Sequence, residues 1–155
     1  MGDVAGGKGA SLCSLFQSGF PVAEGFMVCS QAFREFMTDN QLWEEVLKTI
    51  ESIDWEDDCS LSSAGERLRS RIMNAPMSED LIQLISQYYA RFGEDVPVAV
   101  RSSGTAEDLE DTSFAGQQET FLYVVGKDNL VQFIKACWAS LYNDCAIFYR
   151  REKGF

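Results

Sequence analysis

The sequence predicts an α+β domain in which helices pack on a small mixed or antiparallel sheet. Apolar residues recur at helical spacing in several long stretches, and glycine or proline follows most of them. Two short runs of β-forming residues, Val98–Arg101 and Phe121–Val125, lie on either side of a long polar loop. At 155 residues the chain has the size of one domain with a real core.

The first predicted helix follows a glycine-rich stretch, Gly6-Gly-Lys-Gly9. Leu12, Leu15 and Phe16 share one face of it, and Gly19 ends it. A glycine-rich turn with a lysine at a helix start can bind phosphate. The spacing is not that of a Walker A loop, and a surface lysine beside a flexible turn is the alternative interpretation.

The remaining elements follow from the same patterns. A short strand is expected at Phe26–Cys29, and Ser30 and Ser78 are expected to cap the helices that follow them. One further helix runs through Leu61 and Ile72 and ends before Pro76. The other helices are expected over Ser30–Asp39, Leu42–Ile50, Glu79–Phe92, Asn129–Tyr142 and Ala146–Lys153.

Composition excludes several function classes. The net charge of −11 argues against nucleic acid, although one triphosphate needs only a few cations. No stretch has the length of a membrane span or the pattern of a signal peptide. With no histidine, the chain has no histidine base and no phosphohistidine. The five scattered cysteines indicate free thiols in a reducing cytoplasm, most of them small core residues, rather than a zinc site.

Two other conspicuous features are expected to be structural. The acidic run Asp54–Asp58 is interpreted as a solvated linker or helix cap rather than a metal site. Trp43 and Trp55 are expected to pack rather than to stack on a ligand.

The long loop after Arg101 has the composition of an anion site. Small and polar residues, Ser102-Ser-Gly-Thr105, offer hydroxyls and accessible backbone N–H groups, which can form an anion-binding concavity. The arginine beside them supplies donors suited to phosphate, so a triphosphate is the expected ligand. The alternative is a solvated hairpin loop in which Arg101 pairs with Glu107 or Asp108.

The loop and its flanks carry a family resemblance. The sequence from Val98 to Leu122, VAVRSSGTAEDLEDTSFAGQQETFL, resembles the signature of the phosphoenolpyruvate synthase family (pyruvate, water dikinase). It is similar, almost as closely, to the rifampicin phosphotransferases, which share the same N-terminal ATP-binding domain. The glycine-lysine stretch, Gly19–Phe26 and Lys135–Arg150 resemble the family too, although Cys145 stands where relatives commonly carry arginine.

The resemblance implies a fold and a chemistry. Residues 1–155 would form part of an ATP-grasp-type, pyruvate phosphate dikinase-like nucleotide-binding domain. The remaining domains would belong to a longer cytoplasmic enzyme that uses ATP and Mg²⁺. In phosphoenolpyruvate synthases the β-phosphate of ATP passes to a histidine on another domain and then to pyruvate. In the rifampicin enzymes the final acceptor is the antibiotic.

The resemblance also assigns roles to residues. Lys8 and Arg101 would neutralise the ATP phosphates and act in catalysis, and Thr105 would close over the phosphates. Glu107 and Asp108 would shape the loop or pair with Arg101, with contact to Mg²⁺ as the alternative. The metal ligands are expected outside these 155 residues. The loop residues that would join Thr105 are Ser113, Phe114, Ala115, Gly116 and Gln117.

Other function classes stay open at this point. The chain alone is expected to catalyse no net reaction, and the final acceptor would be chosen by other domains. A stand-alone, non-catalytic nucleotide-binding or regulatory module is the alternative to an enzyme domain. A purely structural domain would require Lys8 and Arg101 to be accidental.

Overall fold

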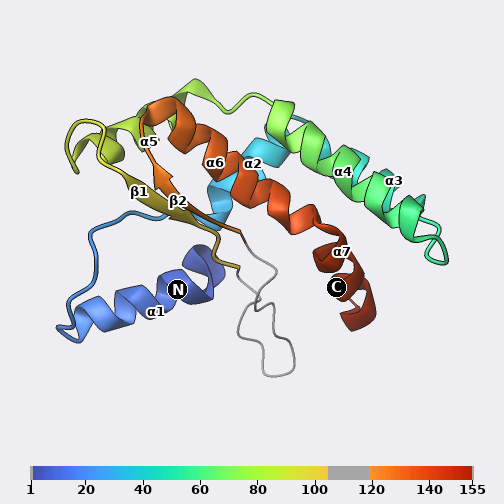
Figure 1. Cartoon of the computed structure of the whole chain (residues 1–155), viewed down its shortest axis with the longest axis horizontal. Helices are drawn as coiled ribbons and strands as arrows, with labels where there is room; N and C mark the ends of the chain where they lie inside the picture. Colours follow the sequence, from blue (N-terminus) through green and yellow to red (C-terminus); the bar gives the residue numbers. More distant parts are fainter. Residues whose placement is uncertain (1, 105–118, 155) are drawn as a thin grey trace.

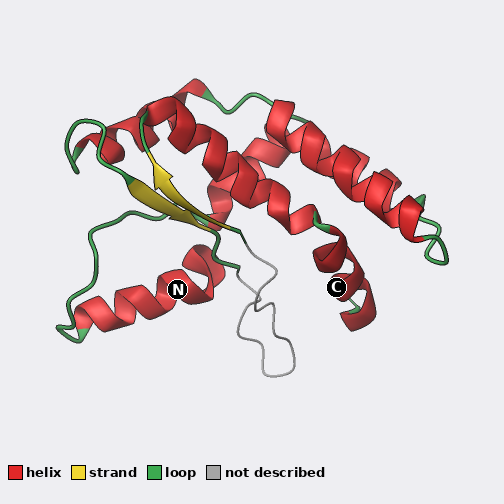
Figure 2. Cartoon of the chain, in the orientation of Figure 1, coloured by secondary structure: helices red, strands yellow, loops and turns green. Residues whose placement is uncertain are grey.

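The computed structural model describes residues 2–104 and 119–154 of the chain (Figure 1). Within them the fold is α+β, as predicted, and the two strands form an antiparallel sheet (Figure 2). None of the helices in these ranges is long and apolar enough to cross a membrane. The elements are α1 (Gly2–Gln17), α2 (Ser30–Asp39), α3 (Leu42–Glu51), α4 (Asp58–Asn74), α5 (Glu79–Ala90), β1 (Val98–Arg101), β2 (Thr120–Val124), α6 (Lys127–Ala139), the 3-10 helix η1 (Ser140–Tyr142) and α7 (Asp144–Lys153).

Helix α6 is the centre of the fold. It contacts both strands, α4, α5 and η1, and it crosses the middle of the molecule in Figure 1. Its Trp138 packs on Phe36 of α2, with ring centroids 5.0 Å apart. Its Phe133 packs on Phe121 of β2 at 4.8 Å. Apolar side chains of α6 therefore join the sheet to the helical layer.

The sheet places Arg101 at the edge where the polar loop begins. Arg101 pairs with Thr120, the first residue of β2, and Val98 pairs with Val124 at the other end. The register shifts between these pairs, and Tyr123 has φ of 60°. One extra residue on β2 is a β-bulge, and such bulges twist a strand and end its regular pairing.

The strand predicted at Phe26–Cys29 is wrong. The two strands among the described residues pair with each other, and residues 20–29 run between α1 and α2 without regular structure. Phe26 packs on Tyr88 and Phe92 of the α5 region, with centroids 5.5 and 6.1 Å away. Alternating apolar residues can thus serve packing alone when no partner strand lies beside them.

The predicted cap at Ser30 is wrong, and the one at Ser78 is confirmed in position but not in its hydrogen bond. Ser30 is already the first helical residue of α2, and its hydroxyl donates to the Asp3 carbonyl oxygen at 2.9 Å. Ser78 occupies the N-cap position of α5 but makes no side-chain capping bond. At the start of α4, by contrast, the Asp57 carboxylate accepts from the Cys59 N–H at 3.0 Å. The acidic run there serves as a cap, as predicted.

The cysteines are free, but the expectation that most lie in the core is wrong. Cys137 on α6 is buried, whereas Cys13 is half-buried. Cys29, Cys59 and Cys145 are exposed, and all three lie near the start of a helix, at α2, α4 and α7.

Candidate functional site

The lysine predicted to contact phosphate lies just after a break in α1. Gly6 has φ of 70° and ψ of 173°, so the helix stops there and a new segment begins at Gly7. Lys8 is the second residue of this segment and is half-buried. The glycine-rich stretch is therefore a helix start, in agreement with the arrangement predicted for phosphate binding.

Three hydrogen bonds join this helix start to the residues that follow Arg101. The Gly7 N–H donates to the Gly104 carbonyl oxygen at 2.9 Å. The Gly9 N–H donates to Ser103 Oγ at 3.1 Å. The Lys8 ammonium donates to the Ser102 carbonyl oxygen at 3.2 Å. Two motifs separated by 94 residues in the sequence thus meet at one place.

Glycine is required by space as well as by backbone conformation at Gly6. A Cβ atom there would lie 2.6 Å from the carbonyl carbon of Ser103, well inside van der Waals contact. The limit at Gly9 is weaker, because its Cβ would lie 2.6 Å from Met27 Sδ, an atom of a flexible side chain. The two glycines allow the loop and the segment after α1 to approach the lysine-bearing turn closely.

Arg101 lies at the end of β1 with its side chain exposed. Val100, the preceding residue, is buried, so the alternation of the strand turns the arginine outward. Ser102 follows it and holds the base of the loop together. The Ser102 N–H and hydroxyl both donate to the Glu119 carbonyl oxygen, at 3.3 and 3.2 Å. Lys8, bonded to Ser102, therefore lies one residue from the arginine backbone.

Cys137 lies beneath this junction on α6. Burial raises the pKa of its thiol to about 11, with a further increase from the Glu119 carboxylate and a partial decrease from the Lys8 ammonium. The thiol is therefore neutral at physiological pH, and it is a packing group rather than a nucleophile.

The structure leaves several predicted site residues without description. Glu107, Asp108 and the loop residues assigned to the phosphates, namely Thr105, Ser113, Phe114, Ala115, Gly116 and Gln117, lie outside the described residues. Among the described residues no group of three or more carboxylate or cysteine side chains is placed to hold a metal ion.

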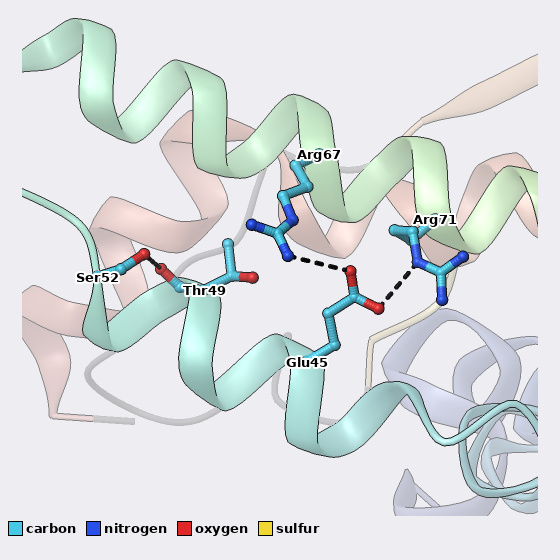
Figure 3. Close-up of polar contacts among 5 residues, drawn as sticks. All are labelled: Glu45, Thr49, Ser52, Arg67 and Arg71. Atoms are coloured by element: carbon cyan, nitrogen blue, oxygen red, sulfur yellow. Dashed lines mark hydrogen bonds and ion pairs between the residues drawn. The ribbon is translucent and has the colours of Figure 1, made fainter.

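Two other polar regions lie away from the lysine and arginine. Glu45 on α3 lies between two arginines of α4, with Arg71 at 2.9 Å and Arg67 at 3.6 Å (Figure 3). Because both arginines are largely exposed, this cluster contributes little beyond orienting the two helices. A cavity of 390 Å³ lies between α2 and the start of α5, and neither Lys8 nor Arg101 lines it.

The sequence predicted phosphate binding at Lys8 and Arg101, but not the contact between Gly6 and Ser103 that brings their two motifs together. A signal was present, because small residues follow the arginine and glycines flank the lysine. Small residues at both motifs are typical of backbones that approach each other closely.

Comparisons with known proteins find relatives over nearly the whole chain. The chain is 42% identical to a probable phosphoenolpyruvate synthase of Methanocaldococcus jannaschii, over 99% of the chain and 13% of that protein. It is 43% identical to the phosphoenolpyruvate synthase of Neisseria meningitidis serogroup B, over 97% of the chain and 20% of that protein. It is 38% identical to the rifampicin phosphotransferase of Bacillus subtilis, over 98% of the chain and 18% of that protein.

The chain spans less than a quarter of the length of these curated relatives. The family description that matches it, pyruvate phosphate dikinase, AMP/ATP-binding domain, covers residues 2–155. Both motifs that meet in the structure lie within this range. The chain therefore belongs to the pyruvate phosphate dikinase AMP/ATP-binding domain family.

Proposed function

We propose that the chain forms the phosphate-binding part of an ATP site of the ATP-grasp type. The observation that carries the proposal is the 3.2 Å bond from the Lys8 ammonium to the carbonyl oxygen of Ser102, next to Arg101. Two cations from distant motifs would then lie beside one polar loop. Their charges, together with the loop's donors, would hold the triphosphate through Thr105 and residues 113–117.

The whole protein is proposed to be a dikinase-type phosphotransferase, with phosphoenolpyruvate synthase as the first candidate. It would convert ATP, pyruvate and water into AMP, phosphoenolpyruvate and phosphate. The identities of 42% and 43% to proteins of that name support this choice. Because the chain contains no histidine, a phosphohistidine carrier would have to lie elsewhere in the protein, as would the pyruvate site.

A rifampicin phosphotransferase is the second candidate, favoured by the 38% identity to the Bacillus subtilis enzyme. The two candidates differ in the acceptor, which residues outside this chain would select. An assay of AMP formation by the full-length protein would distinguish the two candidates. AMP formation would depend on pyruvate in the first case and on the antibiotic in the second. An Arg101→Ala variant of that protein should turn over more slowly by orders of magnitude, because it would lack a charged contact to the transition state.

Mg²⁺ and a cytoplasmic location complete the proposal. Mg²⁺ would accompany ATP, with its ligands outside this chain or, for Glu107 and Asp108, in the loop. A net charge of −11 also makes nucleic acid an improbable partner.

The proposed ATP site predicts the outcome of an NMR titration of the labelled chain with MgATP. Saturable shifts should be confined to the amides near Lys8 and to the loop from Arg101 onward. Lys8→Ala should weaken binding by about tenfold or more, because it removes a charged phosphate contact. Lys48→Ala, which removes an exposed lysine paired with Glu44 on α3, is the matched control and should leave affinity unchanged. Equal effects of the two substitutions would contradict the assignment of Lys8.

A further inference from the structure

Ser103 contacts the lysine-bearing turn from the opposite motif. Its hydroxyl oxygen accepts from the Gly9 N–H at 3.1 Å, and its backbone occupies the space that a Gly6 side chain would need. The next residue, Gly104, accepts from the Gly7 N–H at 2.9 Å. Ser103 is half-buried, and the sequence predicted for it only the general role of a loop hydroxyl in an anion site.

These contacts have the pattern of a helix cap supplied by a distant residue. In an ordinary N-cap, the side chain of the capping residue accepts from an N–H two or three positions later. Gly6 stands at the capping position, with φ of 70° and ψ of 173°, and has no side chain. Ser103 supplies the missing oxygen to Gly9, the third residue of the segment that begins at Gly7.

The cap is connected to the position of Lys8. Lys8 lies between the two capped amides of Gly7 and Gly9, so its backbone is fixed on both sides. Its ammonium is held by the carbonyl oxygen of Ser102, which adjoins both Arg101 and Ser103. The loop thus fixes the lysine at its backbone and at its charged end.

We propose that Ser103 is a positioning residue that caps the helix segment after Gly6 and thereby sets the position of Lys8 beside Arg101. The inference rests on the proposed role of Lys8 in binding ATP phosphates. Ser103 itself need not touch the nucleotide, because it acts through the lysine.

Three variants isolate the hydroxyl. Ser103→Ala removes the acceptor oxygen, and Ser103→Thr keeps it. Ser60→Ala is the matched control. Ser60, in α4, also accepts a hydrogen bond from a backbone N–H through its Oγ, and the donor is Asp54, 2.9 Å away in the connection between α3 and α4. The spectrum of each variant first establishes that it is folded. Should Ser103→Ala fail to fold, Ser103→Gly and the threonine variant carry the comparison.

The first measurement uses the chain without nucleotide. Ser103→Ala should speed hydrogen exchange at the Gly9 amide by about tenfold, the usual effect of losing one hydrogen bond, and should shift the Lys8 amide resonance. Ser103→Thr should restore both, and Ser60→Ala should alter neither. Unchanged Lys8 and Gly9 signals in Ser103→Ala would overturn the proposal, whatever the chain does with ATP.

The second measurement compares affinities for MgATP and AMP. Lys8 would contact the phosphates that ATP has and AMP lacks. Ser103→Ala should therefore lower the affinity for MgATP by about tenfold and the affinity for AMP far less, and Lys8→Ala should have the same effect. In the double variant Lys8→Ala, Ser103→Ala the two losses should not add, since one residue acts through the other. A general loss of stability would lower the affinities for both nucleotides equally.

The outcomes separate the inference from the function on which it rests. If the unmodified chain binds MgATP better than AMP and Ser103→Ala keeps that preference, the role of Ser103 is overturned and ATP binding stands. If the unmodified chain binds neither nucleotide, the proposed ATP site of this chain is overturned. The exchange measurement then still decides whether Ser103 positions Lys8.

Discussion

At Gly6 two independent constraints require the same residue. The backbone has φ of 70°, which residues with a side chain rarely adopt, and Ser103 occupies the space where a Cβ would lie. Either constraint alone would strain a substitution. Together they tie the conformation of the lysine-bearing turn to the position of the loop after Arg101.

Gly6→Ala should therefore loosen the contact between α1 and the loop. The strain of about 1–3 kcal/mol for such a backbone position predicts a ten- to hundredfold loss of exchange protection at Gly9. Amide exchange followed by NMR measures it. Gly2→Ala is the control, because no atom lies within 4 Å of the added methyl group and Gly2 is also in α1. Similar protection in both variants would show that Ser103 and its neighbours move aside at little cost.

Cys137 should be the slowest of the five cysteines to react. Its pKa of about 11, against an ordinary value of 9.0, leaves about one thiolate in a thousand at pH 8 instead of about one in ten. Its reaction with a thiol reagent should speed up only as the pH approaches 11, since the thiolate is the nucleophile. The exposed Cys29, Cys59 and Cys145 should react first, with unfolded protein as the control in which all five react together. Rapid labelling of Cys137 in the folded chain would mean that α6 opens readily.

The residues of the site could be predicted only where the chemistry is visible in the residue type. Lys8 and Arg101 are cations beside glycines and hydroxyls, so each suggests phosphate by itself. The cap from Ser103 to Gly9 could not be predicted, because it joins positions 94 residues apart and depends on how α1 lies against the sheet edge. Whether Thr105 and residues 113–117 join the site stays a prediction.

At the scale of elements, the helices were predicted correctly more often than the strands, since the strand predicted at Phe26–Cys29 is absent. The bounds predicted for Ser30–Asp39 agree with those of α2, because helical periodicity and the following turn are local signals. The run at Phe26–Cys29 also has a local strand pattern. A strand needs a partner, however, and the described partners β1 and β2 pair with each other. A local sequence pattern therefore predicts a helix more reliably than it predicts a strand.

The end of α4 depends on a buried lysine of α6. Lys135 is 6% exposed, and its ammonium donates to the carbonyl oxygens of Met73 at 2.7 Å and Ala75 at 3.0 Å. Burial lowers the pKa of this lysine. The last carbonyl groups of a helix have no partner within the helix, so this lysine satisfies acceptors that burial removes from water.

Lys135→Met should lower the free energy of unfolding by about 1–3 kcal/mol, the cost of leaving buried acceptors without a donor. Methionine keeps most of the length of the side chain, so the change tests the hydrogen bonds more than the packing. Urea denaturation measures the loss. Lys127→Met, at the exposed first residue of the same helix, should change stability by less than about 0.5 kcal/mol. Equal effects would show that the Lys135 bonds contribute little.

At the scale of the whole molecule, α1 lies apart from the core. In the part of the chain that the structure describes, the cluster of buried apolar residues draws on all the other helices and both strands, but on no residue of α1. Leu12, Leu15 and Phe16, which share one face of α1, are 44%, 44% and 71% exposed. Figure 1 shows α1 joined to α2 by the long connection of residues 18–29. Among the described residues, hydrogen bonds join α1 to the fold at Asp3 and at the turn around Lys8, and the candidate site lies at that turn.

This arrangement predicts that α1 opens independently of the core. Segments with few buried apolar contacts exchange their amide hydrogens through local opening, at a free energy well below that of global unfolding. Amides of residues 10–17 should therefore exchange much faster than those of α6, in hydrogen exchange followed by NMR.

MgATP should slow exchange in α1 and leave α6 unchanged, because a ligand bound across Lys8 and Arg101 stabilises only the closed state. AMP is the control, since it lacks the phosphates that would join the two cations, and it should protect α1 less. Exchange in α1 as slow as in α6 would contradict independent opening. Equal protection by AMP and MgATP would instead place the ligand's main contacts away from the lysine.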